Sequence, residues 1–195
     1  MLDQSIPYFE LTMLRPAGLP VPPTPPRADG FFVKPYAPGD ERHWARIEKS
    51  VGEFDAESAA LSYFEKEFAP QPDLLRARMC FVCTPDGLPV ATATAWEKHG
   101  AHLLHWVATV PACQRRGLGR AAVLSALRRF PDSAPVLLHT QTWSHDAILL
   151  YHSIGFSLLV TDRDAEAFAK AMQVLKTVYP EQTWQQLMQS SRKSC

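Results

Sequence analysis

The sequence predicts an α/β fold in which helices flank a central mixed β-sheet. Three observations favour it. Short apolar, β-prone segments alternate with stretches of helical period along the chain. The turn Pro85-Asp86-Gly87 joins two such segments in the manner of a β-hairpin. A long apolar run over residues 103–110 passes through a glycine-bearing turn into a helical run. The resulting order is strand, two helices, hairpin, long strand, helix, strand, helix and strand, with no internal repeat.

The first half of the chain predicts three strands and two helices. Asp40 is a plausible N-cap for a helix that runs to about Lys49. Asp55 is predicted to cap a second helix, which continues to about Phe68 with apolar residues at helical spacing. The predicted strands of this half are Phe31–Tyr36, Met79–Thr84 and Val90–Trp96.

The second half predicts the remaining strands and helices. The helix after the glycine turn ends before Pro131, and the next helix begins at Ser144 and ends at Gly155, where a left-handed residue is wanted. The tail turns helical, and its last residues are expected to fray. The predicted strands are Leu103–Val110, Pro135–Thr140 and Phe156–Thr161, and the tail helices span 164–178 and about 181–190.

Length and charge exclude several classes of protein. The chain has 195 residues, which suits one domain with extensions, and 20 basic residues balance 20 acidic ones. No overall positive field therefore attracts nucleic acid or an anionic membrane. No apolar run approaches a membrane-spanning length, and the first residues lack the features of a signal peptide. We therefore expect a cytoplasmic protein.

We expect three parts along the chain. Residues 1–30 form an N-terminal arm that ends in a proline-rich connector, residues 31–162 form the main domain, and residues 163–195 form a C-terminal helical extension packed on it. Residues 8–14 are β-prone and too apolar for a free tail, so they are predicted to pack on the domain. The connector contains six prolines between residues 15 and 30 and is typical of an extended segment.

The cysteines do not predict a metal site. Cys80 and Cys83 have C-x-x-C spacing, but residues three apart on a strand point to opposite faces, and no second such pair exists. Reduced core cysteines are the interpretation we favour, and no bound metal is expected.

The most informative segment is Gln114-Arg115-Arg116-Gly117-Leu118-Gly119, which links the strand at 103–110 to the helix at 118–130. Such a turn points several backbone N–H groups outward at a helix N-terminus, and this arrangement favours phosphate. Glycines let the backbone approach a phosphate without an intervening Cβ. Arg120 adds a further positive charge to those of the two preceding arginines. The segment is predicted to hold a pyrophosphate, and an ordinary tight turn is the alternative.

Two motifs resemble those of the GNAT superfamily of N-acetyltransferases. Gln114, Gly117 and Gly119 match the family's Q/R-x-x-G-x-G/A motif. Residues 147–156 resemble its second signature, A-x-x-L-Y-x-x-x-G-F, and the two motifs together are much more specific than either alone. The resemblance covers about Phe31 to Thr161 and implies a GNAT-like acyl-CoA N-acyltransferase fold with acetyl-CoA as donor.

The resemblance implies where the donor binds. Backbone N–H groups of residues 115–120, from Arg115 through Leu118 to Arg120, would hold the CoA pyrophosphate. The strand before the turn would carry a bulge that opens a slot for pantetheine. Main-chain groups of Val107, Ala108 and Thr109 would pair with pantetheine as an added strand does, and one of their N–H groups would stabilise the oxyanion. Ser144 stands where many members have an asparagine that binds the CoA or orders the tyrosine.

The resemblance also suggests the catalytic groups. Tyr151 occupies the place of the tyrosine that protonates the departing thiolate; a tyrosine that only packs in the core is the alternative. His105 is the best candidate for the base, because imidazole titrates near neutral pH and members carry a histidine or glutamate at an analogous strand position. A histidine that packs in the sheet is the alternative. Weaker candidates for the base are His102, Glu97, His145 and a water chain to solvent.

The sequence therefore predicts an acetyl-CoA-dependent N-acetyltransferase. A primary amine of a small molecule or peptide would attack the thioester directly in a ternary complex, because no nucleophile is placed for a covalent step. Cys113 lies in the phosphate turn and does not face the thioester slot. A non-catalytic acyl-CoA-binding or interaction module on the same fold is the other hypothesis. The acceptor is not identified, and a homodimer is left open.

Overall fold

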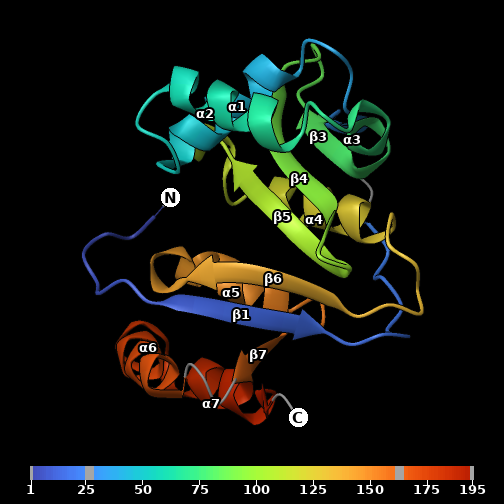
Figure 1. The fold of residues 1–195 in the computed structure, drawn as a ribbon. Coiled ribbons are helices and arrows are strands. Elements are labelled where there is room, and N and C mark those ends of the chain that lie inside the picture. The colour runs from blue at the N-terminus through green and yellow to red at the C-terminus, as the bar shows by residue number, and fades with distance from the viewer. Residues whose placement is uncertain (1, 25–28, 161–164, 194–195) are drawn as a thin grey trace. The chain divides into compact units, whose positions relative to one another are not determined.

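The computed structural model describes residues 2–24, 29–160 and 165–193, and residues 161–164 lie outside it (Figure 1). Two compact units divide the chain: unit 1 contains Met1–Pro20 and Asp132–Cys195, and unit 2 contains Val21–Pro131. These two units do not coincide with the three parts expected from the sequence. The boundaries of those three parts remain a prediction.

Unit 2 is built on an antiparallel run of four strands in the order β2-β3-β4-β5. The hairpin between β3 and β4 is confirmed: Gly87 has a left-handed φ of 94°, and the Thr84 N–H donates to the Leu88 oxygen at 2.9 Å. The strands are β2 (Phe32–Pro35), β3 (Met79–Cys83), β4 (Pro89–Lys98) and β5 (Ala101–Thr109).

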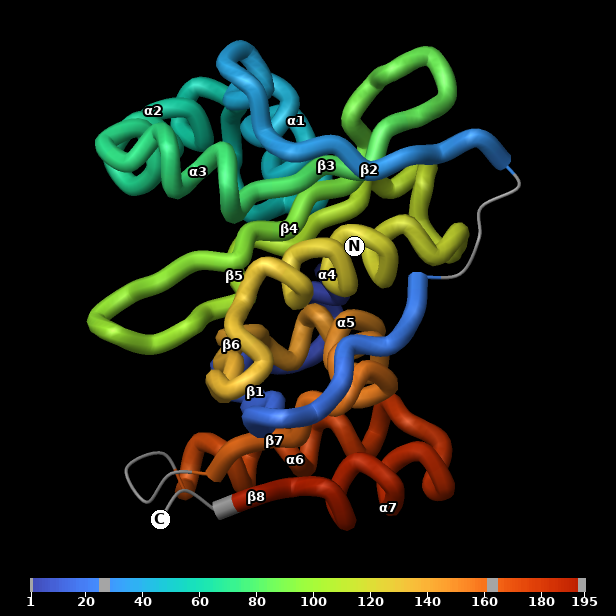
Figure 2. Tube along the Cα trace, turned by 90° about the vertical axis from the view of Figure 1, so that its right-hand side faces the viewer, coloured from blue at the N-terminus to red at the C-terminus, as the bar shows by residue number. Residues whose placement is uncertain are grey.

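Helices cover both faces of these strands, as the full burial of β3 shows. On one face Cys80 approaches the Ala122 oxygen of α4 at 3.5 Å, and its cross-strand partner Ala93 leaves room for that helix. On the other face Trp96 meets Phe68, which follows α2, with ring centroids 5.0 Å apart. Figure 2 shows the chain trace through these helices and strands from a second direction. The helices are α1 (Glu41–Val51), α2 (Glu57–Glu67), α3 (Pro72–Arg78) and α4 (Leu118–Leu127).

Unit 1 holds the strands β6 (Val136–Gln141), β1 (Glu10–Arg15), β7 (Ser157–Val160) and β8 (Arg192–Lys193), in that order. The N-terminal strand β1 pairs antiparallel with both β6 and β7. It therefore lies between these two strands. The prediction that residues 8–14 pack on the domain is confirmed, because Leu11 and Met13 are buried in the core.

Three helices complete unit 1: α5 (His145–His152), α6 (Ala165–Val178) and α7 (Glu181–Gln189). Gly155, with φ 96°, follows α5 as the sequence predicts. The buried guanidinium of Arg15 fixes the end of β1 in place, because it donates to the oxygens of Ile154 at 3.1 Å and Pro20 at 2.8 Å. The tail helices are confirmed over the described residues.

Some local predictions are wrong. The N-cap of α2 is Ala56, not Asp55, and α3 was not predicted. Asp40 stands at the N-cap of α1 but makes no capping bond; it accepts from Lys34 Nζ at 2.7 Å and from the Ala37 N–H instead. Arg192 and Lys193 form the short strand β8, which is parallel to β7 and was not predicted. The last two residues, predicted to fray, lie outside the described residues. At β8, non-local pairing overrides the local signal.

Candidate active site

Strand β5 carries a β-bulge just before Ala108. His105 lies opposite Thr94 and Ala108 lies opposite Thr92, so two residues of β5 face one residue of β4. Trp106, the first of them, has a φ of 48°, which is rare for a bulky residue. A bulge bends a strand and interrupts its ladder of hydrogen bonds. The bulge expected before the glycine turn is therefore present. The resemblance implied a bulge in this strand but did not give its position.

The turn after β5 opens onto the N-terminus of α4. After a short 3₁₀ helix (Pro111–Cys113), Arg115 and Gly117 both adopt left-handed backbone conformations, with φ of 60° and 74°. Gly117 is the N-cap of α4 and has no side-chain capping bond, and the first turn of the helix contains no acidic residue. The N–H groups at the start of a helix have no intrahelical acceptor. They carry a partial positive charge, which suits a phosphate.

The charged side chains of the turn are partly engaged with neighbours in unit 2. The Arg116 guanidinium lies over the Phe31 ring, 4.5 Å from its centroid, and 3.5 Å from the Asp29 carboxylate. About half of the Arg116 side chain is exposed, so its charge still contributes to the local field. The backbone, more than the arginine side chains, is therefore the part of this turn shaped for an anion.

His105 lies on the face of the sheet that α1 and α2 cover. Its ring centroid is 5.2 Å from that of Trp106 and 6.4 Å from that of Phe68, and the side chain is half-buried. The Tyr63 hydroxyl accepts from Trp106 Nε1 at 3.3 Å, and Trp44 packs on both rings. An aromatic wall thus stands beside the predicted base. Tyr63 and Trp106 could not be singled out from the sequence, because no local signal predicts the positive φ of Trp106.

The weaker candidates for the base are held in ion pairs. Glu97 accepts from Arg78 at 2.5 Å and lies 3.4 Å from His102 Nδ1, so the two candidates occupy one surface cluster. In unit 1, Nε2 of His145 lies 3.3 Å from the Asp3 carboxylate. These contacts give each group a structural role. His105 is the candidate that stands at the bulge.

Two predicted site residues belong to unit 1. Tyr151 lies in α5 and is 6% exposed, and its ring meets the Phe156 ring edge-on at a centroid distance of 6.0 Å. Ser144 occupies the N-cap of α5 as predicted, but it makes no capping hydrogen bond. The other predicted site residues lie together in unit 2, on β5, in the turn and in the first turn of α4: His105, Val107, Ala108, Thr109, Gln114, Arg115, Arg116, Gly117, Leu118, Gly119 and Arg120.

Comparison with known protein families decides the relationship. The family model described as acetyltransferase (GNAT) family matches residues 42–156, which include the bulged strand, the turn and α5. The chain belongs to the GNAT acetyltransferase family. The resemblance drawn from the two motifs is thereby confirmed. No curated protein matches the chain.

Solved structures share the GNAT fold. A GCN5-related N-acetyltransferase from Sphaerobacter thermophilus is 20% identical with a TM-score of 0.62, and the match covers 78% of this chain and 49% of that one. A putative GNAT acetyltransferase from Novosphingobium aromaticivorans is 19% identical with a TM-score of 0.54, covering 78% and 61%. This GNAT chain therefore spans about half to three fifths of the length of these two relatives. The predicted fold, a mixed sheet flanked by helices, is confirmed.

Three further observations concern metal-binding groups, the cysteine thiols and membrane-spanning helices. Within the described ranges, no group of three metal-binding side chains comes together. Cys80, Cys83 and Cys113 are free thiols, and burial raises the pKa of the first two. No helix in the described part of the chain is both long and apolar enough to cross a membrane.

Proposed function

We propose that this GNAT chain transfers an acetyl group from acetyl-CoA to a primary amine of a small molecule or peptide. The observation that carries the proposal is the left-handed Gly117 turn, which follows a bulged strand and opens onto an uncapped helix N-terminus. Such a turn suits the pyrophosphate of a CoA donor. The partners are acetyl-CoA and an amine; a homodimer and a cytoplasmic location remain predictions from the sequence.

The proposed reaction is a direct attack in a ternary complex. His105 removes a proton from the ammonium form of the acceptor, and the nitrogen lone pair forms a bond to the thioester carbonyl carbon. The carbonyl oxygen takes up negative charge, which an N–H group of residues 107–109 stabilises. The C–S bond then breaks and the nitrogen loses its second proton to solvent; the CoA sulfur leaves as a thiolate, and Tyr151 protonates it. Solvent exchanges the protons of both side chains for the next cycle.

The residues after the bulge support the donor part of this proposal. Ala108 and Thr109 pair with Thr92 and Ala91 of β4, which holds this stretch of β5 extended. The Val110 N–H donates to the Val90 oxygen at 2.9 Å and continues the pairing up to the turn. An extended stretch held on one side is what addition of a pantetheine arm requires. We propose main-chain contacts of Val107, Ala108 and Thr109 with that arm.

Thiol release from acetyl-CoA, measured with a panel of amines, tests the proposed function. The variants Tyr151→Phe and His105→Ala should each lower kcat by about 10²-fold or more, as loss of a general acid or base does. Tyr179→Phe is the matched control, because it also removes one hydroxyl from a buried tyrosine of unit 1, where that hydroxyl donates to the His145 main-chain oxygen. Unchanged turnover in Tyr151→Phe and His105→Ala would contradict the assigned roles.

The alternative function, a non-catalytic acyl-CoA-binding module, has its own result in the same experiment. Tight binding of CoA by calorimetry, with no amine supporting thiol release, would favour that module over the enzyme. Absence of CoA binding would contradict both.

A further inference from the structure

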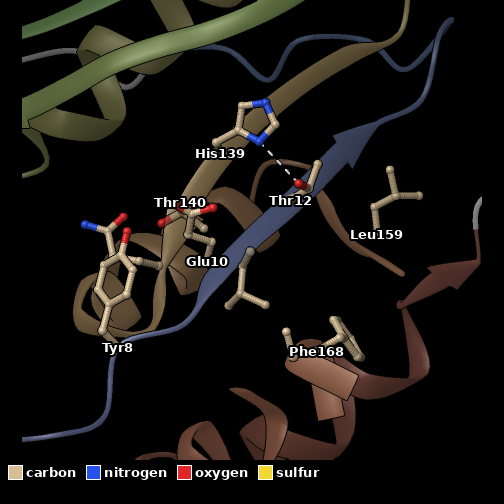
Figure 3. A pocket seen from close by; sticks show the side chains of 10 residues that line it. Tyr8, Glu10, Thr12, His139, Thr140, Leu159 and Phe168 are labelled. Atoms are coloured by element: carbon tan, nitrogen blue, oxygen red, sulfur yellow. Dashed lines mark hydrogen bonds between the residues drawn. The ribbon is translucent and has the colours of Figure 1, made fainter. Parts of the chain in front are cut away.

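A pocket of about 540 Å³ opens within unit 1, on the sheet face that carries the outward side chains of β1 (Figure 3). We name it the β1 pocket. Its walls come from β1, β6, β7 and α6, and its volume falls in the range of small-molecule sites, roughly 300–1,000 Å³. The lining includes Tyr8, Glu10, Thr12, His139, Leu159 and Phe168.

The strand register explains why these side chains converge. Thr12 lies opposite His139 of β6 on one side and opposite Leu159 of β7 on the other, so all three side chains stand on one face. Glu10 lies two residues before Thr12 and therefore shares this face. The neighbouring residues Leu11 and Met13 are buried in the core, and Leu11 also lines the pocket. The pocket is thus a product of non-local pairing by the N-terminal strand.

The two ends of the β1 pocket differ in character. Tyr8 and Glu10 stand at one end, whereas Leu159 and Phe168 stand at the other (Figure 3). Thr12 and His139 lie between the ends, with 3.2 Å from Thr12 Oγ1 to His139 Nδ1. A ligand that fits both ends has one polar end and an apolar body.

The charge of the polar end selects a cation. Glu10 has no salt-bridge partner among the residues that the structure describes, and none of the lining residues is a lysine or an arginine. An anionic ligand would therefore meet an uncompensated carboxylate. An ammonium group would instead donate a charge-assisted hydrogen bond to Glu10 and be attracted electrostatically to the Tyr8 ring.

The chain holds Tyr8 in position at this end. The Tyr8 ring packs edge-on against Trp143 at a centroid distance of 5.0 Å, and Trp143 Nε1 donates to the Ile6 oxygen at 2.7 Å. The Thr142 hydroxyl donates to the Pro7 oxygen at 2.6 Å and accepts from the Phe9 N–H at 3.0 Å. These bonds fix the residues on both sides of Tyr8. The Tyr8 ring is therefore preorganised although about half of its surface is exposed.

We propose that the β1 pocket binds a primary amine with an apolar body, as the ammonium ion. Glu10 contacts the ammonium group, and Leu159 and Phe168 contact the apolar body. This binding does not depend on the proposed acetyl transfer.

Calorimetric titration of the full chain without acetyl-CoA tests the binding site. The probe is 2-phenylethylamine, which is positively charged at pH 7, and the controls are the uncharged 2-phenylethanol and the anionic phenylacetate. We expect the amine to bind with 1:1 stoichiometry and both controls to bind at least tenfold more weakly. Equal binding of the three compounds, or no binding of the amine at millimolar concentration, would overturn the proposal.

Variants locate the site. Glu10→Gln should weaken binding of the amine about five- to tenfold, whereas Glu166→Gln should not, because Glu166 pairs with Lys170 on α6 and does not line the pocket. Ala167→Phe should abolish binding by filling the pocket from the exposed side of α6, with little effect on folding. Unchanged binding in both Glu10→Gln and Ala167→Phe would place the amine elsewhere and refute the proposal.

Discussion

The side chain of Gln114 donates a hydrogen bond from Nε2 to the main-chain oxygen of Thr109, 3.0 Å away. This bond ties the start of the glycine turn to the end of β5. Gln114 therefore acts in the GNAT motif by holding the turn against the strand, and its amide is already engaged before any donor binds. The bond bridges the two stretches that we propose to hold pantetheine and pyrophosphate.

Replacing Gln114 should loosen the turn without unfolding the chain. We expect Gln114→Ala to cost about 1 kcal/mol of unfolding free energy, which is typical of one lost hydrogen bond. The Kd for CoA should rise about tenfold, because a mobile turn must be ordered on binding. Urea unfolding and calorimetry measure the two effects. Gln114→Glu, which keeps the length but removes the donor, should behave like Gln114→Ala; full CoA affinity in both variants would contradict the tethering role.

Gly117 tests the phosphate turn itself. Its φ of 74° suits glycine and is tolerated by asparagine. Gly117→Val should lose CoA binding, and Gly117→Asn should also lose most of it while keeping nearly the stability of the parent chain. Gly87→Asn is the control, because Gly87 is also left-handed and a Cβ there meets nothing within 4 Å. If Gly117→Asn binds CoA as tightly as the parent chain, the pyrophosphate does not approach this backbone.

Glu48 makes stability depend on pH. Its side chain is buried in α1, Oε1 has no hydrogen-bond partner among the described residues, and desolvation, with the nearby Glu53 charge, raises its pKa well above the usual range. The folded chain keeps this proton at pH values where the unfolded chain has lost it. Stability therefore falls as pH rises above the ordinary carboxyl pKa and levels off above the folded pKa.

Glu48→Gln should remove this dependence. We expect the variant to be more stable than the parent chain by about 1 kcal/mol at pH 7.5 and to show little gain near pH 4. Urea unfolding across this pH range measures it, with the exposed Glu57→Gln as control. The same pH slope in parent and variant would show that Glu48 is not the group responsible.

Substitution of Gly155 is expected to lower the unfolding free energy, because its backbone is left-handed. Its φ is 96°, and a Cβ would also meet the end of the Leu19 side chain. Gly155→Ala should lower the unfolding free energy by about 1–2 kcal/mol, mostly from the left-handed backbone. Leu19→Ala combined with it should recover little, since the Leu19 side chain can move aside. Full recovery in the double variant would assign the cost to the side-chain clash instead.

The sequence by itself determined the features that local chemistry encodes. Gly117 allows the left-handed backbone of its turn, and Asp86 and Gly87 favour the hairpin. Apolar periodicity gives each strand and helix a side that can be buried. These signals act within a few residues, so the GNAT fold and the glycine turn could be predicted from two motifs and their spacing. The donor role of the turn and the role of Tyr151 stay predictions.

Only the tertiary structure decided the features that depend on distant partners. The insertion of β1 between β6 and β7 creates the pocket that contains Glu10 and His139, residues 129 positions apart in the chain. The left-handed conformation of Trp106 follows from the register of β4 against β5, not from its own preference. A strand carries no local signal for its pairing partner, so the glycine turn could be predicted from the sequence and the β1 pocket could not.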